Sequence, residues 1–177
     1  MLEIIIGCIV VIAIFLIIIT IYYNKFQFVI IKIDEALNNI DTLLDKKREL
    51  LERTRPVIKK EIKFKDYLDG IDSLNKDELN NFELNDILKK FYNELFKVLD
   101  DNEKLFKSES LVSIVEEIND NEEKIIGSIK FYNDSVVSFN HLVAVFPSCV
   151  IAFFCRYKKK EFYNNEKREM YEILNDK

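Results

Sequence analysis

The sequence IIIGCIVVIAIFLIIITI, residues 4–21, contains no charged side chain. An α-helix rises about 1.5 Å per residue, so this run covers about 27 Å, close to the roughly 30 Å hydrocarbon core of a bilayer. Tyr22 and Tyr23 follow the run, and tyrosines suit the headgroup boundary. We therefore expect residues 1–23 to form a transmembrane anchor.

A cleaved signal peptide is the main alternative for this run. It would need a basic segment before the apolar part and small residues at a cleavage site. No Lys or Arg precedes Ile4, and the residues after the run offer no suitable pair of small side chains. A buried core helix would keep one polar face, which is missing here. An uncleaved anchor is the better interpretation.

The charges that flank the run predict its orientation. Lys25 and Lys32 follow it, whereas only the terminal amine lies before Glu3. The positive-inside rule then places residues 24–177 in the cytoplasm and the short N-terminus outside, at the cell (inner) membrane. The three cysteines form no disulfide framework, which suits a reducing compartment.

Composition predicts an all-α fold with few long helices. The chain has 3 Gly and 2 Pro in 177 residues, so turn formers are scarce. The net charge of −5 argues against a nucleic-acid partner, whose binding site would be basic. Two apolar series of coiled-coil type, with steps of three and four, predict helices that pack on partners. The first series is Phe26, Ile30, Ile33, Leu37, Ile40, Leu44 and Leu51, and Lys47 occupies one of its positions. The second series is Leu111, Ile114, Ile118, Ile125, Ile129, Tyr132, Val136, Phe139, Val143 and Phe146, and Glu122 occupies one of its positions.

The boundaries of these helices follow from prolines and capping residues. Pro56 should kink or break the first helix, and Pro147 should end the third. A turn is expected over residues 67–76, with a capping box at Asn75 and Glu78 to begin the second helix. A serine near residues 107–110 should cap the third helix, and a short last helix is expected over residues 160–174.

Short turns between these segments favour an antiparallel up-down helical bundle over residues 24–177. In that arrangement the first helix leaves the membrane, the second returns and the third leaves again. The turn at Phe146 and Pro147 would then lie at the far end of the bundle, roughly 60 Å from the bilayer for a helix of forty residues.

The stretch EEKIIGSIKFYNDSV, residues 122–136, is similar to a signature of the bacterial LemA family. The resemblance continues through Phe139-Asn140 and Phe146-Pro147, and upstream through Ile40-Asp41 to Leu51. It implies a single-pass membrane protein with a cytoplasmic helical bundle and no established enzymatic activity. The chain departs from the family pattern at Ile129 and Arg156, where an arginine and a glycine are usual, and in the charged, Asn-rich residues 64–85.

Three polar residues of the third helix are candidate contacts within a polar seam. Glu122 interrupts the apolar series, and either pairs with Asn38, Asn39 or a base such as Lys46, or reaches water at a loose end of the bundle. Asn133 and Asn140 either face another helix and fix its register or lie on a wet flank beside the core.

The second candidate site is an apolar tip around the last proline. Its residues are Phe146, Pro147, Ile151, Phe153 and Phe154. They either cap the core or form an interaction surface, and the run from Cys149 to Cys155 with its basic tail is also able to lie on a membrane.

No motif points to catalysis. His141 is the only histidine, and a nucleophilic pair with Cys149 would need direct contact and a third orienting group. We expect no enzyme activity, no cofactor, no metal and no small-molecule substrate. The expected role is a membrane-anchored scaffold or adaptor for an unidentified protein, and the alternative is a protein that organises the membrane by self-association.

Overall fold

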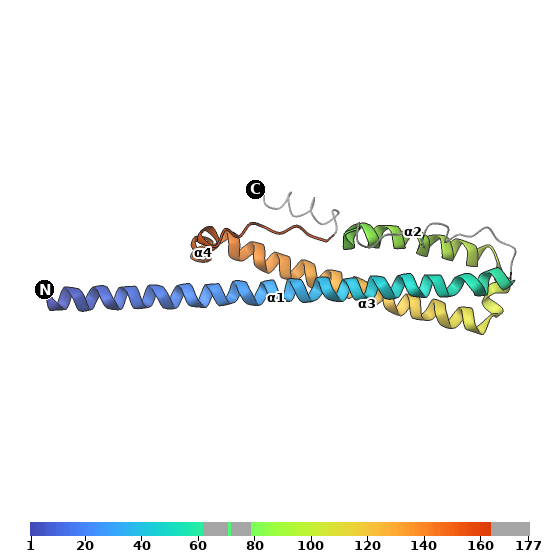
Figure 1. Cartoon of the computed structure of the whole chain (residues 1–177), viewed down its shortest axis with the longest axis horizontal. Coiled ribbons are helices and arrows are strands. Elements are labelled where there is room, and N and C mark those ends of the chain that lie inside the picture. The colour runs from blue at the N-terminus through green and yellow to red at the C-terminus, as the bar shows by residue number, and fades with distance from the viewer. Residues whose placement is uncertain (62–70, 72–78, 164–177) are drawn as a thin grey trace. The chain divides into compact units, whose positions relative to one another are not determined.

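The computed structural model describes residues 1–61, 71 and 79–163 (Figure 1). Most of these residues are helical and none lies in a strand, which confirms the expected all-α class. The elements are α1 (Leu2–Glu61), α2 (Asn81–Asp100), the 3-10 helix η2 (Glu103–Lys107), α3 (Glu109–Ala144) and α4 (Ser148–Phe154). The first turn expected from sequence lies almost wholly outside the described residues.

The chain divides into two compact units. The first unit contains Met1–Glu35 and the chain from Phe131 onward, and the second contains Ala36–Lys130. The long helices α1 and α3 each contribute to both units, because each crosses a boundary without interruption.

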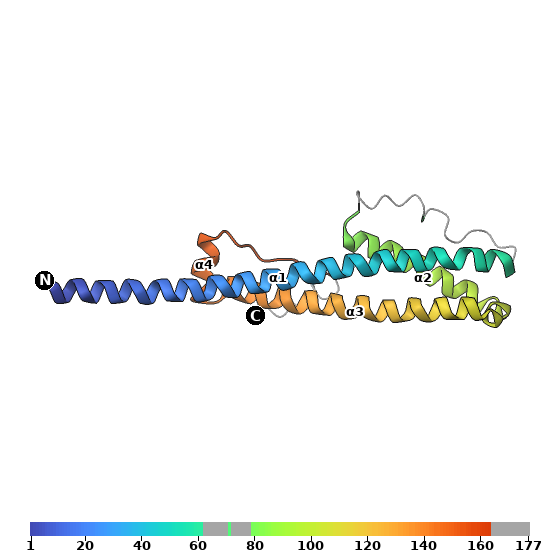
Figure 2. The same ribbon diagram turned by 60° about the horizontal axis from the view of Figure 1, so that its bottom comes forward.

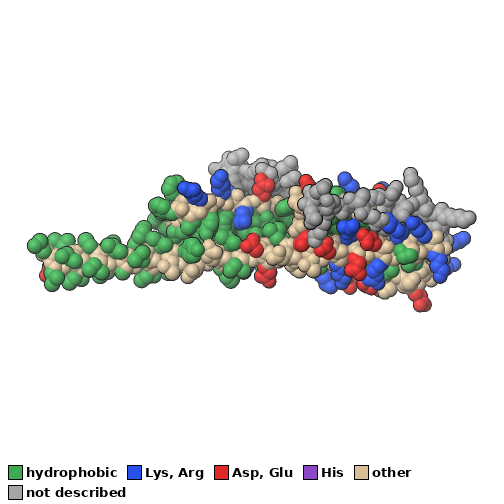
Figure 3. All heavy atoms as spheres, in the orientation of Figure 1, with side chains coloured by type: hydrophobic (Ala, Val, Ile, Leu, Met, Phe, Trp, Pro, Cys, Tyr) green, Lys and Arg blue, Asp and Glu red, His purple; other side chains and the backbone are tan. Residues whose placement is uncertain are grey.

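The N-terminal part of α1 is an uncovered apolar helix. Every residue from Met1 to Ile18 is exposed, and this part of α1 is long and apolar enough to cross a membrane. Figure 3 shows hydrophobic side chains along its visible face. Ile19 and Tyr22 are the first partly covered residues, and Phe26 is fully buried. The packed core therefore begins where the apolar run ends.

Pro56 lies inside α1 and does not break it, so of the expected kink or break the break is excluded. The helix continues to Glu61, and the Pro56 side chain is exposed. Leu51 and Ile58 are buried on either side of it. A proline inside a helix costs about 3 kcal/mol, and the burial of apolar side chains on both sides offsets this cost.

In the second unit α1 and α3 run antiparallel. Near one end Asn39 Nδ2 donates to Ser128 Oγ at 2.7 Å. Near the other, Arg53 Nη1 lies 3.1 Å from Glu117 Oε2. Residue numbers thus rise along α1 as they fall along α3, and Figure 2 shows the two helices side by side.

The direction of α2 differs from the expected path. Asn81, at its start, donates to the Leu37 carbonyl oxygen, and Tyr92 lies beside Lys47, so α2 runs parallel to α1. The expected path assumed a short turn that would send the second helix back along the first. Instead, α3 rather than α2 is the helix that runs back along α1.

The N-terminus of α2 has a capping box five residues later than predicted. The Asn80 side chain accepts from the backbone N–H groups of Phe82 and Glu83 at 3.0 Å, and the Glu83 carboxylate accepts from the Asn80 N–H at 3.2 Å. Asn75 lies outside the described residues, so its own capping role stays a prediction.

The first unit has an aromatic core. The rings of Phe26 and Phe139 are 5.7 Å apart, and Tyr157 lies 4.9 Å from Phe26 and 5.8 Å from Phe139. Gln27 Nε2 donates to the Tyr157 hydroxyl at 2.9 Å. These contacts place the end of α3 and the segment after α4 against α1 just beyond the apolar run. The expectation of a far tip is therefore wrong, because Phe139, near the end of α3, packs on Phe26 of α1 within this unit.

Candidate functional site

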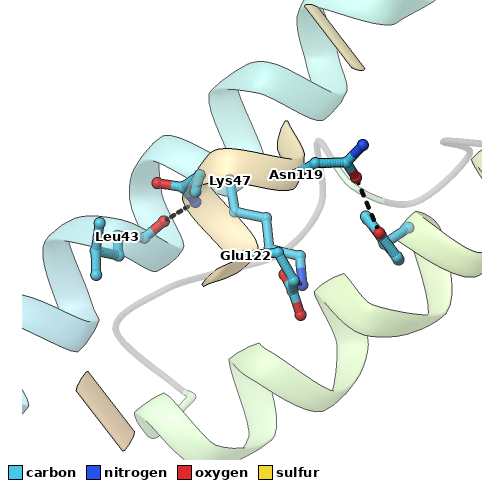
Figure 4. Close-up of polar contacts among 6 residues, drawn as sticks. Leu43, Lys47, Asn119 and Glu122 are labelled. Carbon is cyan, nitrogen blue, oxygen red and sulfur yellow. Dashed lines mark hydrogen bonds and ion pairs between the residues drawn. The ribbon is translucent and has the colours of Figure 1, made fainter. Parts of the chain in front are cut away.

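A charged pair lies in the core of the second unit. Lys47 Nζ and Glu122 Oε2 are 2.6 Å apart, and Figure 4 shows the two side chains meeting between α1 and α3. The Lys47 side chain is fully buried, whereas that of Glu122 is 21% exposed. The two charged interruptions of the apolar series therefore face each other.

The environment of Lys47 acts against its charge. Burial lowers the pKa of this ammonium below its ordinary value, and the Glu122 carboxylate opposes that shift. Its Nζ also lies 5.3 Å from the centre of the Tyr92 ring of α2, a cation–π contact. Burial, followed by the Glu122 charge, raises the pKa of the Tyr92 phenol. The cluster thus joins three helices around one buried cation.

Two hydrogen bonds extend this cluster between the helices (Figure 4). Asn121 Nδ2 donates to the Leu43 carbonyl oxygen at 3.0 Å, and the Tyr92 hydroxyl donates to Asn119 Oδ1 at 3.1 Å. Lys46, which the sequence suggested as a partner of Glu122, is exposed. The missed signal was that Lys47 is the one charged position in the apolar series of α1.

Asn133 and Asn140 hold the segment that follows α4. Asn140 donates from Nδ2 to the Lys160 carbonyl at 2.9 Å and accepts the Lys160 N–H at 2.7 Å. The buried Asn133 accepts the Tyr163 N–H at 2.8 Å. Both asparagines therefore bond to the non-helical segment that follows α4. They neither face another helix nor lie on a wet flank. Residues 160–163 are not helical, and the rest of the expected last helix lies outside the described residues.

The apolar tip separates into a buried and an exposed part. Ile151 is buried, and Pro147 is half-buried. Phe146, Phe153 and Phe154 are 79%, 79% and 78% exposed. We name these three phenylalanines the aromatic tip. Core capping accounts for Ile151 and leaves the aromatic tip unexplained.

The sequence suggested one pair to consider for catalysis, His141 and Cys149, and no metal site. His141 is exposed on α3, and Cys149 is half-buried on α4. Over residues 1–61, 71 and 79–163, no group of three or more His, Cys, Asp or Glu side chains is placed to hold a metal ion. The structure does show a buried ion pair, an exposed aromatic tip, and two asparagines that hold the segment after α4. We name these two residues, Asn133 and Asn140, the asparagine clasp.

A comparison with protein families matches residues 36–173 to the LemA family. The chain belongs to the LemA family. The match contains Lys47, Glu122, both clasp asparagines and the aromatic tip, and it begins after the apolar N-terminal run. Searches of the curated proteins and of the solved structures found no match. LemA membership confirms the resemblance seen in residues 122–136.

Proposed function

We propose that this LemA protein is a single-pass membrane scaffold without catalytic activity, with its helical bundle in the cytoplasm. The observation that carries the proposal is the two-part surface of α1. The helix is apolar and exposed from Met1 to Ile18, and from Phe26 onward it supplies core residues. One continuous helix thus joins a membrane span to a packed bundle that has charged outer faces.

The orientation is part of the proposal. Lys25 and Lys32 lie directly after the span, and their ammonium groups lie 5.0 Å and 4.5 Å from the rings of Tyr22 and Phe28. Two lysines directly after the span support a cytoplasmic position for the start of the bundle under the positive-inside rule.

The first experiment is purification of the tagged full-length chain from membranes, with the fragment of residues 1–28 as control. A protein recovered near one-to-one with the full chain, and absent from the control, supports the scaffold. Recovery of the chain alone, in a defined oligomer, contradicts an adaptor role and favours self-association.

Self-association is the second candidate, and one surface favours it. Phe28 and Ile31 are 60% and 62% exposed on α1, away from the buried Phe26, Val29 and Ile33. Two exposed apolar side chains at helical spacing suit a contact between copies. If they form it, Phe28→Ser with Ile31→Ser dissociates the oligomer in detergent, and Asp34→Ser with Glu35→Ser on neighbouring exposed positions does not. Equal masses for both variants would contradict this candidate.

A further inference from the structure

We propose that the aromatic tip inserts into the headgroup region of the bilayer that the N-terminal helix spans, as a second, shallow membrane contact. The inference rests on the membrane span of the proposed function. The occupant is an anionic lipid surface, and three observations on the first unit support it.

The first observation is the level of α4 along α1. Phe139 packs on Phe26, and α3 ends five residues later, at Ala144. Antiparallel helices advance about 1.5 Å per residue each, so Ala144 is level with about Ile21, the last residue of the apolar run. α4 begins four residues after Ala144 and lies beside this part of α1 in both views (Figures 1 and 2). The aromatic tip is therefore at the depth of the expected membrane surface.

The second observation is the continuity of the apolar surface. Phe153 and Phe154 point away from the core, and Val150 on the same short helix is also exposed. The exposed face of α1 is apolar up to the same level. In Figure 3 hydrophobic side chains continue from the N-terminal run onto α4. Aromatic side chains are favoured at this boundary, where one face is apolar and the other is wet.

The third observation is the charge that follows the aromatic tip. Arg156, Lys158 and Lys159 are exposed directly after α4, and the described acidic side chain nearest in sequence, Glu161, comes after them. A basic segment beside exposed aromatic residues is the composition of an interfacial anchor, and basic side chains are attracted to anionic headgroups. α3 and α4 also meet at 90°, so α4 turns across the direction of the long helix. An element lying in the plane of the surface requires such a turn.

The test measures the depth of single sites in the full-length chain. Cys8, Cys149 and Cys155 are replaced by Ala, and one cysteine with an NBD fluorophore is placed at Phe153, at Asp134 or at Ile12. Asp134 is the matched control, because it is exposed on α3 in the same unit and lies farther from the apolar run. Each protein is reconstituted into vesicles of phosphatidylcholine and phosphatidylglycerol at 3:1. Quenching is measured with a nitroxide in the lipid acyl chain and with aqueous iodide.

We expect the lipid nitroxide to quench Phe153→Cys at least threefold more than Asp134→Cys, with the opposite order for iodide. Equal lipid quenching at these two positions, with strong quenching at Ile12→Cys, overturns the tip contact and leaves the span intact. Protection of position 153 from both quenchers means that protein covers it, which also overturns the proposal. Weak lipid quenching at Ile12→Cys overturns the span itself, and the tip contact with it.

Charge variants test the anionic lipid. Arg156→Gln, Lys158→Gln and Lys159→Gln together should at least halve the lipid quenching at position 153 in these vesicles and leave it unchanged in pure phosphatidylcholine. The control replaces Lys124 and Lys130, which are exposed in the second unit, by Gln. An equal effect of both sets would contradict a role of the basic segment. Phe154→Cys, at a side chain as exposed as Phe153, repeats the depth measurement independently.

Discussion

At the scale of single residues, the ion pair of Lys47 and Glu122 places a buried charge in the core. Removing two charges from water opposes folding, and their attraction repays this only when both are present. Lys47 is fully buried, so it depends on Glu122, whereas Glu122 keeps some contact with water. The two residues should therefore respond differently to substitution.

We expect Glu122→Gln to lower the free energy of unfolding by about 2–4 kcal/mol, because it leaves a buried cation without its counter-charge. Glu122→Leu combined with Lys47→Met should be neutral or stabilising, since apolar side chains of similar size replace the pair. Thermal unfolding of the full chain in detergent, followed by circular dichroism, measures both. The control Arg53→Gln, at a pair exposed on both sides, should change stability by less than about 1 kcal/mol. Destabilisation by the double variant equal to that by Glu122→Gln would contradict the pairing argument.

The lowered pKa of Lys47 predicts a dependence of stability on pH. Between the folded pKa and the ordinary value of 10.5, the unfolded chain binds more protons than the folded chain. The stability of the folded chain therefore rises with pH through that window. Below the window, the full cost of burying the charged ammonium group is present. Relative to Lys47→Met, the unchanged chain should gain stability as pH rises from 7 toward the ordinary lysine pKa of 10.5. A difference that stays constant over this range would contradict the lowered pKa.

At the scale of elements, the segment after α4 is held by contacts with side chains of α3, in place of the backbone hydrogen bonds of a helix. Residues 157–163 form no helix, yet they are held against α3. Asn140 bonds both backbone groups of Lys160, the Tyr132 hydroxyl donates to the Glu161 carbonyl at 3.1 Å, and Tyr163 stacks edge-on against Tyr132. These contacts fix an extended segment that carries the basic residues after the aromatic tip.

Asn140→Ala should release this segment. Removing the amide leaves the Lys160 N–H and carbonyl without their partner, at a cost of about 1–3 kcal/mol for each group that becomes buried and unpaired. Amide hydrogen exchange in the full chain should show at least tenfold faster exchange at Lys160, with helix α1 unchanged. Asn39→Ala, which removes a bond between exposed side chains, is the control. Unchanged exchange at Lys160 would show that the clasp does not hold the segment.

At the scale of the whole molecule, the direction of each long helix decides which surfaces meet. Within the second unit α1 and α3 are antiparallel, and within the first unit Phe139 of α3 packs on Phe26 of α1. An up-down path through α2 would have sent α3 the other way. Inside the first unit, the contacts of Phe139 and Tyr157 with Phe26 place the aromatic tip near the apolar run.

Cross-linking tests this order directly. In a chain without its natural cysteines, Asn39→Cys with Ser128→Cys should react with a short bifunctional maleimide, because the native side chains are 2.7 Å apart. Asn39→Cys with Ser113→Cys, the control, should not react, because Ser113 lies fifteen residues, or about 22 Å, farther along α3. After proteolysis between the two sites, a cross-linked chain keeps its two fragments joined on a gel, and a chain without the cross-link separates into two bands. Reaction of the second pair alone would contradict the antiparallel order.

The sequence by itself determined the all-α class, the apolar N-terminal helix, the buried stripes of α1 and α3, and the family. These are local properties, since they follow from length, periodicity and motifs along one segment. Only the tertiary structure decided that Lys47 meets Glu122, that α2 runs parallel to α1, and that the aromatic tip lies beside the apolar run. Periodicity shows which face of a helix is buried, but it does not show which helix covers that face or in which direction it runs. Capping contacts and core packing settle those choices only when the chain is assembled.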